Sequence, residues 1–141
     1  MTDKITIRPM VPLDLNFILS TWLKSYKYSS DMVRRMRDEE YFKTYEPMLK
    51  EIIANSSPLI ACLTAESDVI LGYMIRQYQA EANCIHYCFV KESWRKLGIF
   101  KMLLKAADFQ GKVYFSHWTA PVNSLTNKYP DFIYNPYRLG V

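Results

Sequence analysis

Residues 84–107 read CIHYCFVKESWRKLGIFKMLLKAA, and this stretch predicts a strand, a short turn and a helix in direct succession. Residues 84–90 are strand-forming, the segment after them is polar, and apolar residues recur at helical spacing after Gly98. A strand that feeds a helix through a tight turn directs several backbone N–H groups at one small volume, where the helix dipole adds partial positive charge. The stretch therefore predicts a turn that can bind phosphate.

The spacing of this turn separates it from the common phosphate-binding loops. It matches neither GxxxxGKS/T nor GxGxxG, which argues against nucleoside triphosphates and dinucleotides of the usual kind. It resembles instead the acyl-CoA motif of the GCN5-related N-acetyltransferases, in which a strand ending in valine is followed by Arg/Gln-x-x-Gly-x-Gly/Ala and a leucine-rich helix. The matching residues are Val90, Arg95, Lys96, Leu97, Gly98, Ile99, Phe100, Lys101, Leu103 and Leu104.

The resemblance implies a ligand and a set of binding residues. In that family the amides of this turn hold the pyrophosphate of coenzyme A, and the strand edge, here Phe89 and Val90, hydrogen-bonds the pantetheine arm. Phe100 departs from the pattern, because the family usually carries Gly or Ala there. A bulky side chain is acceptable if it points into the core, but it could also crowd the phosphate. An ordinary strand–helix unit with a glycine in its connection is the alternative.

Length and composition predict one domain spanning residues 1–141, because half of the residues are hydrophobic and can form one substantial core. No apolar run approaches the roughly 20 residues that span a bilayer, and the polar start MTDKITIRP lacks the apolar stretch of a secretory signal. Cys62, Cys84 and Cys88 lie in apolar, strand-like runs, which suits buried reduced thiols better than disulfides. We expect a cytoplasmic protein with no membrane partner.

Charge and spacing narrow the classes of ligand. The net charge of +4, from 18 basic and 14 acidic residues, favours an anionic ligand without demanding nucleic acid. A nucleic-acid-binding module that uses Lys, Arg and Tyr explains the composition but leaves the turn at 95–100 unexplained. Cys84, His86 and Cys88 do not suit a metal, because residues i and i+4 of a strand lie about 13 Å apart, too far for ~2.3 Å bonds to one zinc ion. We therefore expect no metal.

Hydrophobic periodicity along the rest of the chain predicts an α/β (α+β) fold. Apolar residues alternate in the strand-like segments and recur at helical spacing between them. A strand, a helix and a strand at this length form a right-handed unit with parallel strands. We expect strands at residues 4–10, 59–64, 69–79, 84–90 and 113–118, and helices from Leu13, from Met32 with a break at Pro47, from Gly98 to Gly111, and at 121–129.

The resemblance implies how these elements are arranged. The sheet is then mostly antiparallel, with one parallel strand pair that splays apart for the pantetheine arm and with helices on both faces. The carboxyl end is shorter than in the family, because only 12 residues follow Tyr129 and allow one closing strand at most. The remaining sheet edge could be completed by a second subunit, so a homodimer is a hypothesis.

The candidate catalytic groups follow from the chemistry of acetyl transfer. An amine with a pKa near 10 is protonated at neutral pH, so the reaction needs a base. His86 titrates in a useful range and Glu81 precedes it, although a histidine in such a strand is more often a hydrogen-bonded core group and a carboxylate in a turn is usually solvated. By the resemblance, Tyr129 is the acid near the CoA sulfur, or it simply packs. His117, on the second parallel strand, is a further candidate for lining the cleft.

The remaining site residues also come from the resemblance. Asn123 matches an asparagine of the CoA-binding region, and Tyr26 and Tyr28, in a predicted loop at 24–30, stand where the family shapes its acceptor pocket. The leading interpretation is an acetyl-CoA-dependent N-acetyltransferase acting on a protein lysine, an N-terminus or a small-molecule amine. The alternative is a catalytically inactive protein of this fold that binds a partner, which the absence of a carboxylate base on the strand supports.

Overall fold

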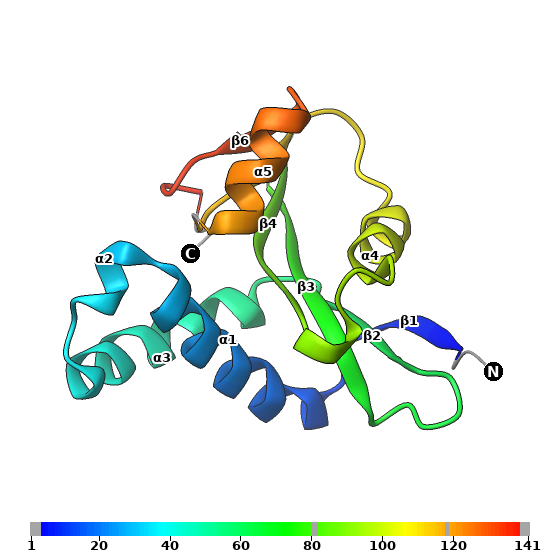
Figure 1. Cartoon of the computed structure of the whole chain (residues 1–141), viewed down its shortest axis with the longest axis horizontal. Helices are drawn as coiled ribbons and strands as arrows, with labels where there is room; N and C mark the ends of the chain where they lie inside the picture. Colours follow the sequence, from blue (N-terminus) through cyan, green and yellow to red (C-terminus); the bar gives the residue numbers. More distant parts are fainter. Residues whose placement is uncertain (1–3, 80–81, 118, 139–141) are drawn as a thin grey trace.

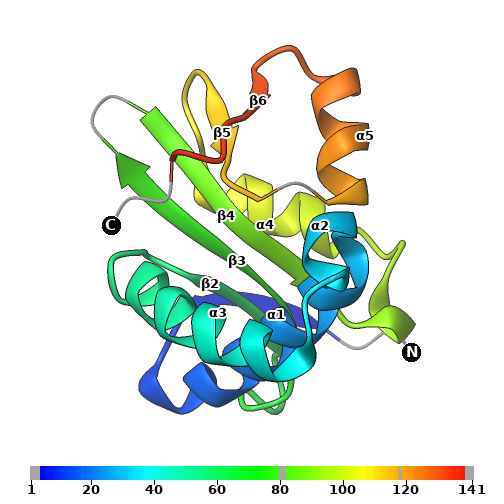
Figure 2. The ribbon, with the colours of Figure 1, turned by 90° about the vertical axis from the view of Figure 1, so that its left-hand side faces the viewer.

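The computed structural model describes residues 4–79, 82–117 and 119–138. This part of the chain forms one six-stranded sheet with helices on both faces (Figures 1 and 2), which confirms the α/β (α+β) fold. The strands are β1 (Ile5–Pro9), β2 (Leu59–Leu63), β3 (Ile70–Gln79), β4 (Ala82–Val90), β5 (Val113–Phe115) and β6 (Phe132–Tyr134). The helices are η1 (Pro12–Asp14), α1 (Leu15–Ser29), α2 (Asp31–Arg34), α3 (Asp38–Ala54), η2 (Glu92–Trp94), α4 (Ile99–Ala107) and α5 (Ala120–Lys128).

The strands lie side by side in their order along the chain, from β1 to β6. β1, β2, β3 and β4 are antiparallel neighbours, whereas β5 is parallel to both β4 and β6. The mostly antiparallel sheet with a parallel pair is thus confirmed, and the β5–β6 pairing adds a second parallel contact that the sequence did not predict. β6 is the single closing strand that the short carboxyl end allows.

The parallel strands β4 and β5 diverge after three paired residues. Asn83–Ile85 of β4 pair with Val113–Phe115, and the Ser116 N–H donates to the Ile85 carbonyl at 3.3 Å. β4 then continues to Val90, paired on its other side with β3. The predicted splayed pair is present, and it leaves one edge of β4 open in the middle of the sheet.

Two apolar clusters hold the helices to the sheet, one on each face. α1, α2 and α3 pack against the first cluster, which contains Trp22, and α4 and α5 pack against the second, which contains Leu103. Side chains of a strand alternate between faces. Tyr87 accordingly belongs to the first cluster while Cys88 packs against the second. The open part of β4 therefore faces both sides of the sheet.

A β-bulge interrupts β4 at the start of this open part. Ile75 pairs with Tyr87 and Arg76 pairs with Ile85, so His86 is the extra residue. A bulge re-aims side chains and increases the local twist of the strand. Gly72 of β3 lies farther along, where a Cβ atom would stand 2.5 Å from the Phe89 carbonyl oxygen. This close approach of the two backbones requires glycine.

Two helices differ from the sequence prediction. The loop predicted at residues 24–30 is wrong, because α1 continues to Ser29. Residues 24–30 show no apolar helical period, but the Tyr26 ring packs between Tyr45 of α3 and Tyr87 of β4 and stabilises this last turn. The predicted break at Pro47 is also wrong. A helical proline costs about 3 kcal/mol, which burial of the flanking side chains offsets; these are Tyr41, Leu49, Ile52 and Ile53.

The elements around β5 are shorter than predicted. α4 ends at Ala107, and Asp108 takes the left-handed conformation with φ 49°, so Gly111 lies in the next turn and does not end the helix. The strand predicted at 113–118 ends at Phe115, and Trp118 lies outside the described residues. Thr119 caps α5, because its Oγ1 accepts from the Val122 N–H.

Candidate active site

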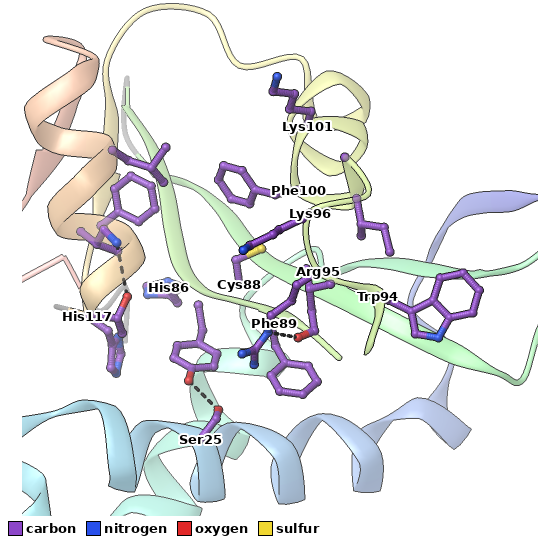
Figure 3. A pocket seen from close by; sticks show the side chains of 18 residues that line it. Ser25, His86, Cys88, Phe89, Trp94, Arg95, Lys96, Phe100, Lys101 and His117 are labelled. Atoms are coloured by element: carbon purple, nitrogen blue, oxygen red, sulfur yellow. Dashed lines mark hydrogen bonds between the residues drawn. The ribbon is translucent and has the colours of Figure 1, made fainter. Parts of the chain in front are cut away.

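A cleft of about 770 Å³ opens where β4 and β5 diverge. One wall is β4 from His86 to Val90, with the following turn and the start of α4, and the other wall is formed by residues after β5 and by α5 (Figure 3). The cleft reaches both faces of the sheet, since Tyr87 belongs to the α1-side cluster and Ile99 to the α4-side cluster. Its other lining residues are Ser25, Cys88, Phe89, Trp94, Arg95, Lys96, Gly98, Phe100, Lys101, Phe115, His117, Thr119 and Leu125, with Val122.

The turn before α4 exposes unused backbone N–H groups at one end of this cleft. Lys96 and Gly98 have positive φ values of 66° and 84°, and the turn is exposed to solvent. The first amide that bonds into the helix is that of Met102, which donates to the Gly98 carbonyl at 3.0 Å. Within the described chain, the N–H groups from Lys96 to Lys101 donate to no protein acceptor. Successive unpaired amides at a helix start form an anion site.

The side chain of Arg95 fixes the turn to the end of β4. Arg95 Nε donates to the Val90 carbonyl at 2.9 Å, and the Lys91 N–H donates to the Leu71 carbonyl at 2.8 Å. Lys96 and Lys101 add positive charge beside the free amides (Figure 3). The arrangement combines rigid donors with two cations, which suits a diphosphate.

Phe100 lies at the junction of this turn and the apolar part of the cleft. Its ring extends from the first turn of α4 into the cleft (Figure 3) and packs against the α4-side cluster. Its backbone N–H is among those without a protein acceptor in the described residues. The side chain thus contributes an apolar wall while the amide remains available.

His86 is held from both sides by hydrogen bonds. Its Nε2 lies 2.7 Å from Gln77 Oε1 and its Nδ1 lies 2.6 Å from Ser116 Oγ. Burial lowers the pKa of His86 to about 4. Both ring nitrogens are engaged and the ring is neutral at pH 7, so His86 offers no free nitrogen to take a proton from a substrate.

The structure does not bring every predicted site residue to the cleft. Tyr129, at the end of α5, packs on Phe132 and lines a different, smaller pocket of about 280 Å³, so the predicted general acid lies outside the cleft. Asn123, Tyr28 and Leu97 are exposed and also lie outside its lining. Tyr26 is buried beneath it, in ring contact with two residues that do line it. Glu81 lies outside the described residues.

Several lining residues were not predicted as site residues, Ser25, Thr119 and Val122 among them. Ser25 of α1 pairs its hydroxyl with that of Tyr87 at 2.6 Å and lies on the α1 side of the cleft (Figure 3). Thr119 and Val122 come from the start of α5. The sequence Thr119-Ala-Pro is a helix-start signal, with a capping residue before a proline in the first turn, and it could have placed the start of this helix.

The buried histidines predict a loss of stability in acid. Burial lowers the pKa of His86 to about 4 and that of His117 to about 3, from an ordinary 6.5. Below pH 6.5 the unfolded chain therefore binds protons that the folded chain does not, so the free energy of unfolding decreases as the pH is lowered. At pH 5 each histidine should cost about 2 kcal/mol relative to pH 7. Urea unfolding at both pH values measures the difference in the free energy of unfolding. His117→Phe should reduce this difference by about 2 kcal/mol. An unchanged difference in the variant would contradict the expectation.

Comparisons with known proteins place this geometry in a known fold. No family model and no curated protein sequence matches the chain, whereas solved structures do. A protein from Pyrococcus furiosus assigned as an acetyl transferase superposes with a TM-score of 0.69 at 17% identity, covering 89% of this chain and 91% of that one. The chain has the fold of the GCN5-related N-acetyltransferases.

Two further acetyltransferase structures support the same assignment of fold. The ribosomal-protein-alanine N-acetyltransferase from Brucella melitensis biovar Abortus 2308 has a TM-score of 0.58 at 19% identity, covering 90% of this chain and 89% of that one. The PaiA N-acetyltransferase from Thermoplasma acidophilum, solved in complex with coenzyme A, has a TM-score of 0.55 at 18% identity, covering 74% and 70%. At these identities the likeness is one of fold.

None of the helices in the described ranges is both long and apolar enough to cross a membrane. The same residues contain no group of three or more His, Cys, Asp or Glu side chains arranged to hold a metal ion. Cys62, Cys84 and Cys88 are free thiols.

Proposed function

We propose that the protein is an N-acetyltransferase that transfers the acetyl group of acetyl-CoA to an amine. The observation that carries the proposal is the set of N–H groups from Lys96 to Lys101, in the exposed turn and at the start of α4, which have no acceptor among the described residues and lie at the cleft. An anion of the size of a diphosphate satisfies these amides. The coenzyme A complex of a neighbour with this fold is consistent with that ligand.

The open edge of β4 and the apolar cleft suit the rest of the coenzyme. Beyond Ile85 the strand no longer pairs with β5, so its backbone is available to the amide groups of a pantetheine arm. The walls between the turn and the α1 side are mostly apolar, with Phe100, Phe115 and Leu125 among them. The acetyl group would then lie near the centre of the sheet, between the two faces.

The reaction requires few side chains of the protein. The acceptor nitrogen forms a bond to the thioester carbonyl carbon, and the carbon–sulfur bond breaks with its electron pair going to sulfur. The nitrogen loses one proton, which the leaving thiolate takes up directly or through water to give free coenzyme A. Fixed backbone N–H groups near the end of β4 could stabilise the negative charge that develops on the carbonyl oxygen. Because His86 is fully engaged and Tyr129 lies elsewhere, the structure gives no support for either as the proton-transfer group.

Two measurements test the proposal. Titration calorimetry should show saturable binding of acetyl-CoA and of coenzyme A to the protein. A thiol-release assay should then show free coenzyme A on addition of an acceptor from a panel of amines. If acetyl-CoA did not bind, the proposal would be wrong. If it bound but no amine released thiol, the inactive partner-binding alternative would replace it.

A further inference from the structure

A network of hydrogen bonds connects Gln77 of β3 to His117 at the cleft. Gln77 contacts His86, His86 contacts Ser116, and Ser116 Oγ lies 2.9 Å from Nδ1 of His117. His86, Ser116 and His117 are each at most 4% exposed. These three buried residues have little access to solvent, so the protons of their hydrogen bonds must be distributed among the members of the network.

The donors and acceptors of this hydrogen-bond network determine which ring nitrogen of His117 carries the proton. Gln77 Oε1 can only accept, so Nε2 of His86 carries the proton and its Nδ1 accepts from the Ser116 hydroxyl. Cys84 does not donate to this nitrogen, because its thiol donates to the Arg138 carbonyl at 3.4 Å. Ser116 has one proton to give, so Nδ1 of His117 must donate to Ser116 Oγ. Nε2 of His117 is then an unprotonated acceptor.

This acceptor has no protein partner in the described part of the chain. His117 Nε2 is buried and makes no hydrogen bond there, although His117 is 3% exposed and lines the cleft. The rings of Trp22, Tyr26 and Tyr45 contact the imidazole edge-on at 5.5, 5.1 and 6.0 Å between centroids, which holds its orientation. A buried polar atom left without a partner costs roughly 1–3 kcal/mol. A ligand that donates an N–H would recover this cost.

The charges of the cleft restrict which amine can do so. Arg95, Lys96 and Lys101 are cationic, and the described residues that line the cleft include no aspartate or glutamate. With the phosphates of coenzyme A paired to these cations, a cationic amine would still enter an apolar part of the cleft with no carboxylate to pair with it. Without such a carboxylate, the lining also lacks the usual base for removing a proton from an ammonium group.

We propose that the acceptor is an amine that enters uncharged, such as an arylamine, and that Nε2 of His117 binds its N–H on the α1 side of the cleft. The inference rests on the proposed function and names its substrate class. His117 and Ser25 lie on that side, while Lys96 and Lys101 lie toward α4 (Figure 3), so the acceptor and the phosphates occupy opposite ends. We therefore expect polyamines and other multiply charged amines not to serve as acceptors.

The low basicity of His117 agrees with this role. Burial and the neighbouring His86 lower the pKa of His117 to about 3, and the backbone of His86 only partly opposes this effect. The imidazole is thus neutral at every pH where the protein would act. It binds and orients the N–H group but does not take its proton.

The test uses the whole chain with 15N-labelled histidines, observed by two-bond 1H–15N correlation spectra at pH 7 with coenzyme A present. p-Toluidine and benzylamine are isomers of similar size, but the first is uncharged at pH 7 and the second is a cation. We expect His117 to be the Nδ1–H tautomer and its Nε2 resonance to move saturably with p-toluidine and not with benzylamine. An Nε2–H tautomer, no movement, or equal movement with both amines would overturn the proposal.

Variants and calorimetry separate this inference from the proposed function. His117→Phe keeps an aromatic ring among the neighbouring rings but removes the acceptor, and should raise the KM for p-toluidine about tenfold. His117→Gln, whose amide oxygen can reach the position of Nε2, should recover most of this loss. The Kd of acetyl-CoA should not change in either variant. If the parent protein did not bind acetyl-CoA, the proposed function would be wrong. An unchanged KM for p-toluidine in His117→Phe would refute the acceptor site alone.

Discussion

Gly98→Glu should raise the Kd of the protein for coenzyme A by at least about 100-fold while leaving the fold intact. Gly98 lies at the centre of the exposed turn, and a Cβ atom there meets no other atom within 4 Å. The carboxylate would place a negative charge among the amides that the diphosphate needs, where two unit charges about 4 Å apart repel by roughly 4 kcal/mol near a protein surface. Calorimetry of the variant with coenzyme A measures the effect.

Gly98→Gln is the matched control for this prediction. Gly98 has φ +84°, so any side chain there costs about 1–2 kcal/mol of stability whatever its charge. Glutamine has the shape of glutamate and carries the same backbone cost, but no charge. We expect Gly98→Gln to bind coenzyme A far more tightly than Gly98→Glu, and the difference to shrink at high salt. If Gly98→Glu bound coenzyme A as the parent does, the phosphate site would lie elsewhere.

The turn that we propose binds phosphate could be located from the sequence because all of its parts are contiguous. A strand ending at Val90, a glycine that can take positive φ and a helix whose apolar face includes Ile99 and Leu103 are readable from the spacing of residues 84–107. The strands of the sheet were predicted from alternating apolar residues, whereas their antiparallel arrangement was implied by the family resemblance. Local periodicity was sufficient for these elements.

The side of the cleft that we assign to the acceptor could not be predicted, because it is built from distant parts of the chain. Whether a ring nitrogen of His86 is free depends on Gln77 and Ser116, which lie on the neighbouring strand β3 and just beyond β5. Tyr129 fitted a sequence pattern, but α5 presents Val122 to the cleft and carries Tyr129 toward Phe132. Side-chain placement of this kind is decided by tertiary packing.

The extension of α1 shows a second reason for failure. Residues 24–30 read KSYKYSS, a polar run without an apolar helical stripe, and such a run predicts a loop. In the structure Lys27 is 5% exposed, and its ammonium group donates to three backbone carbonyls, those of Val33, Arg34 and Met36. Lys27 of α1 thus supplies hydrogen bonds to carbonyls at the end of α2 and in the turn after it. Hydrophobic periodicity gives no sign of such a role.

Lys27→Met should therefore lower the free energy of unfolding by about 3–5 kcal/mol. α2 ends at Arg34, and the carbonyls that accept from Lys27 are orphan acceptors of that end and of the following turn. Methionine fills nearly the same volume but donates no hydrogen bond, so these carbonyls would lose their partner in a buried place. Urea unfolding monitored by tryptophan fluorescence measures the change.

Lys24→Met supplies the comparison on the same helix. Lys24 is exposed one turn before Lys27, so the same substitution there should change stability by no more than about 0.5 kcal/mol. A loss below about 1 kcal/mol in Lys27→Met would mean that water or a rearranged turn can satisfy the carbonyls. The expected loss has a consequence for the site, because Tyr26 adjoins Lys27 and packs on His117 at 5.1 Å. Loosening the end of α1 should therefore weaken acceptor binding while leaving the phosphate-binding turn on the opposite face unchanged.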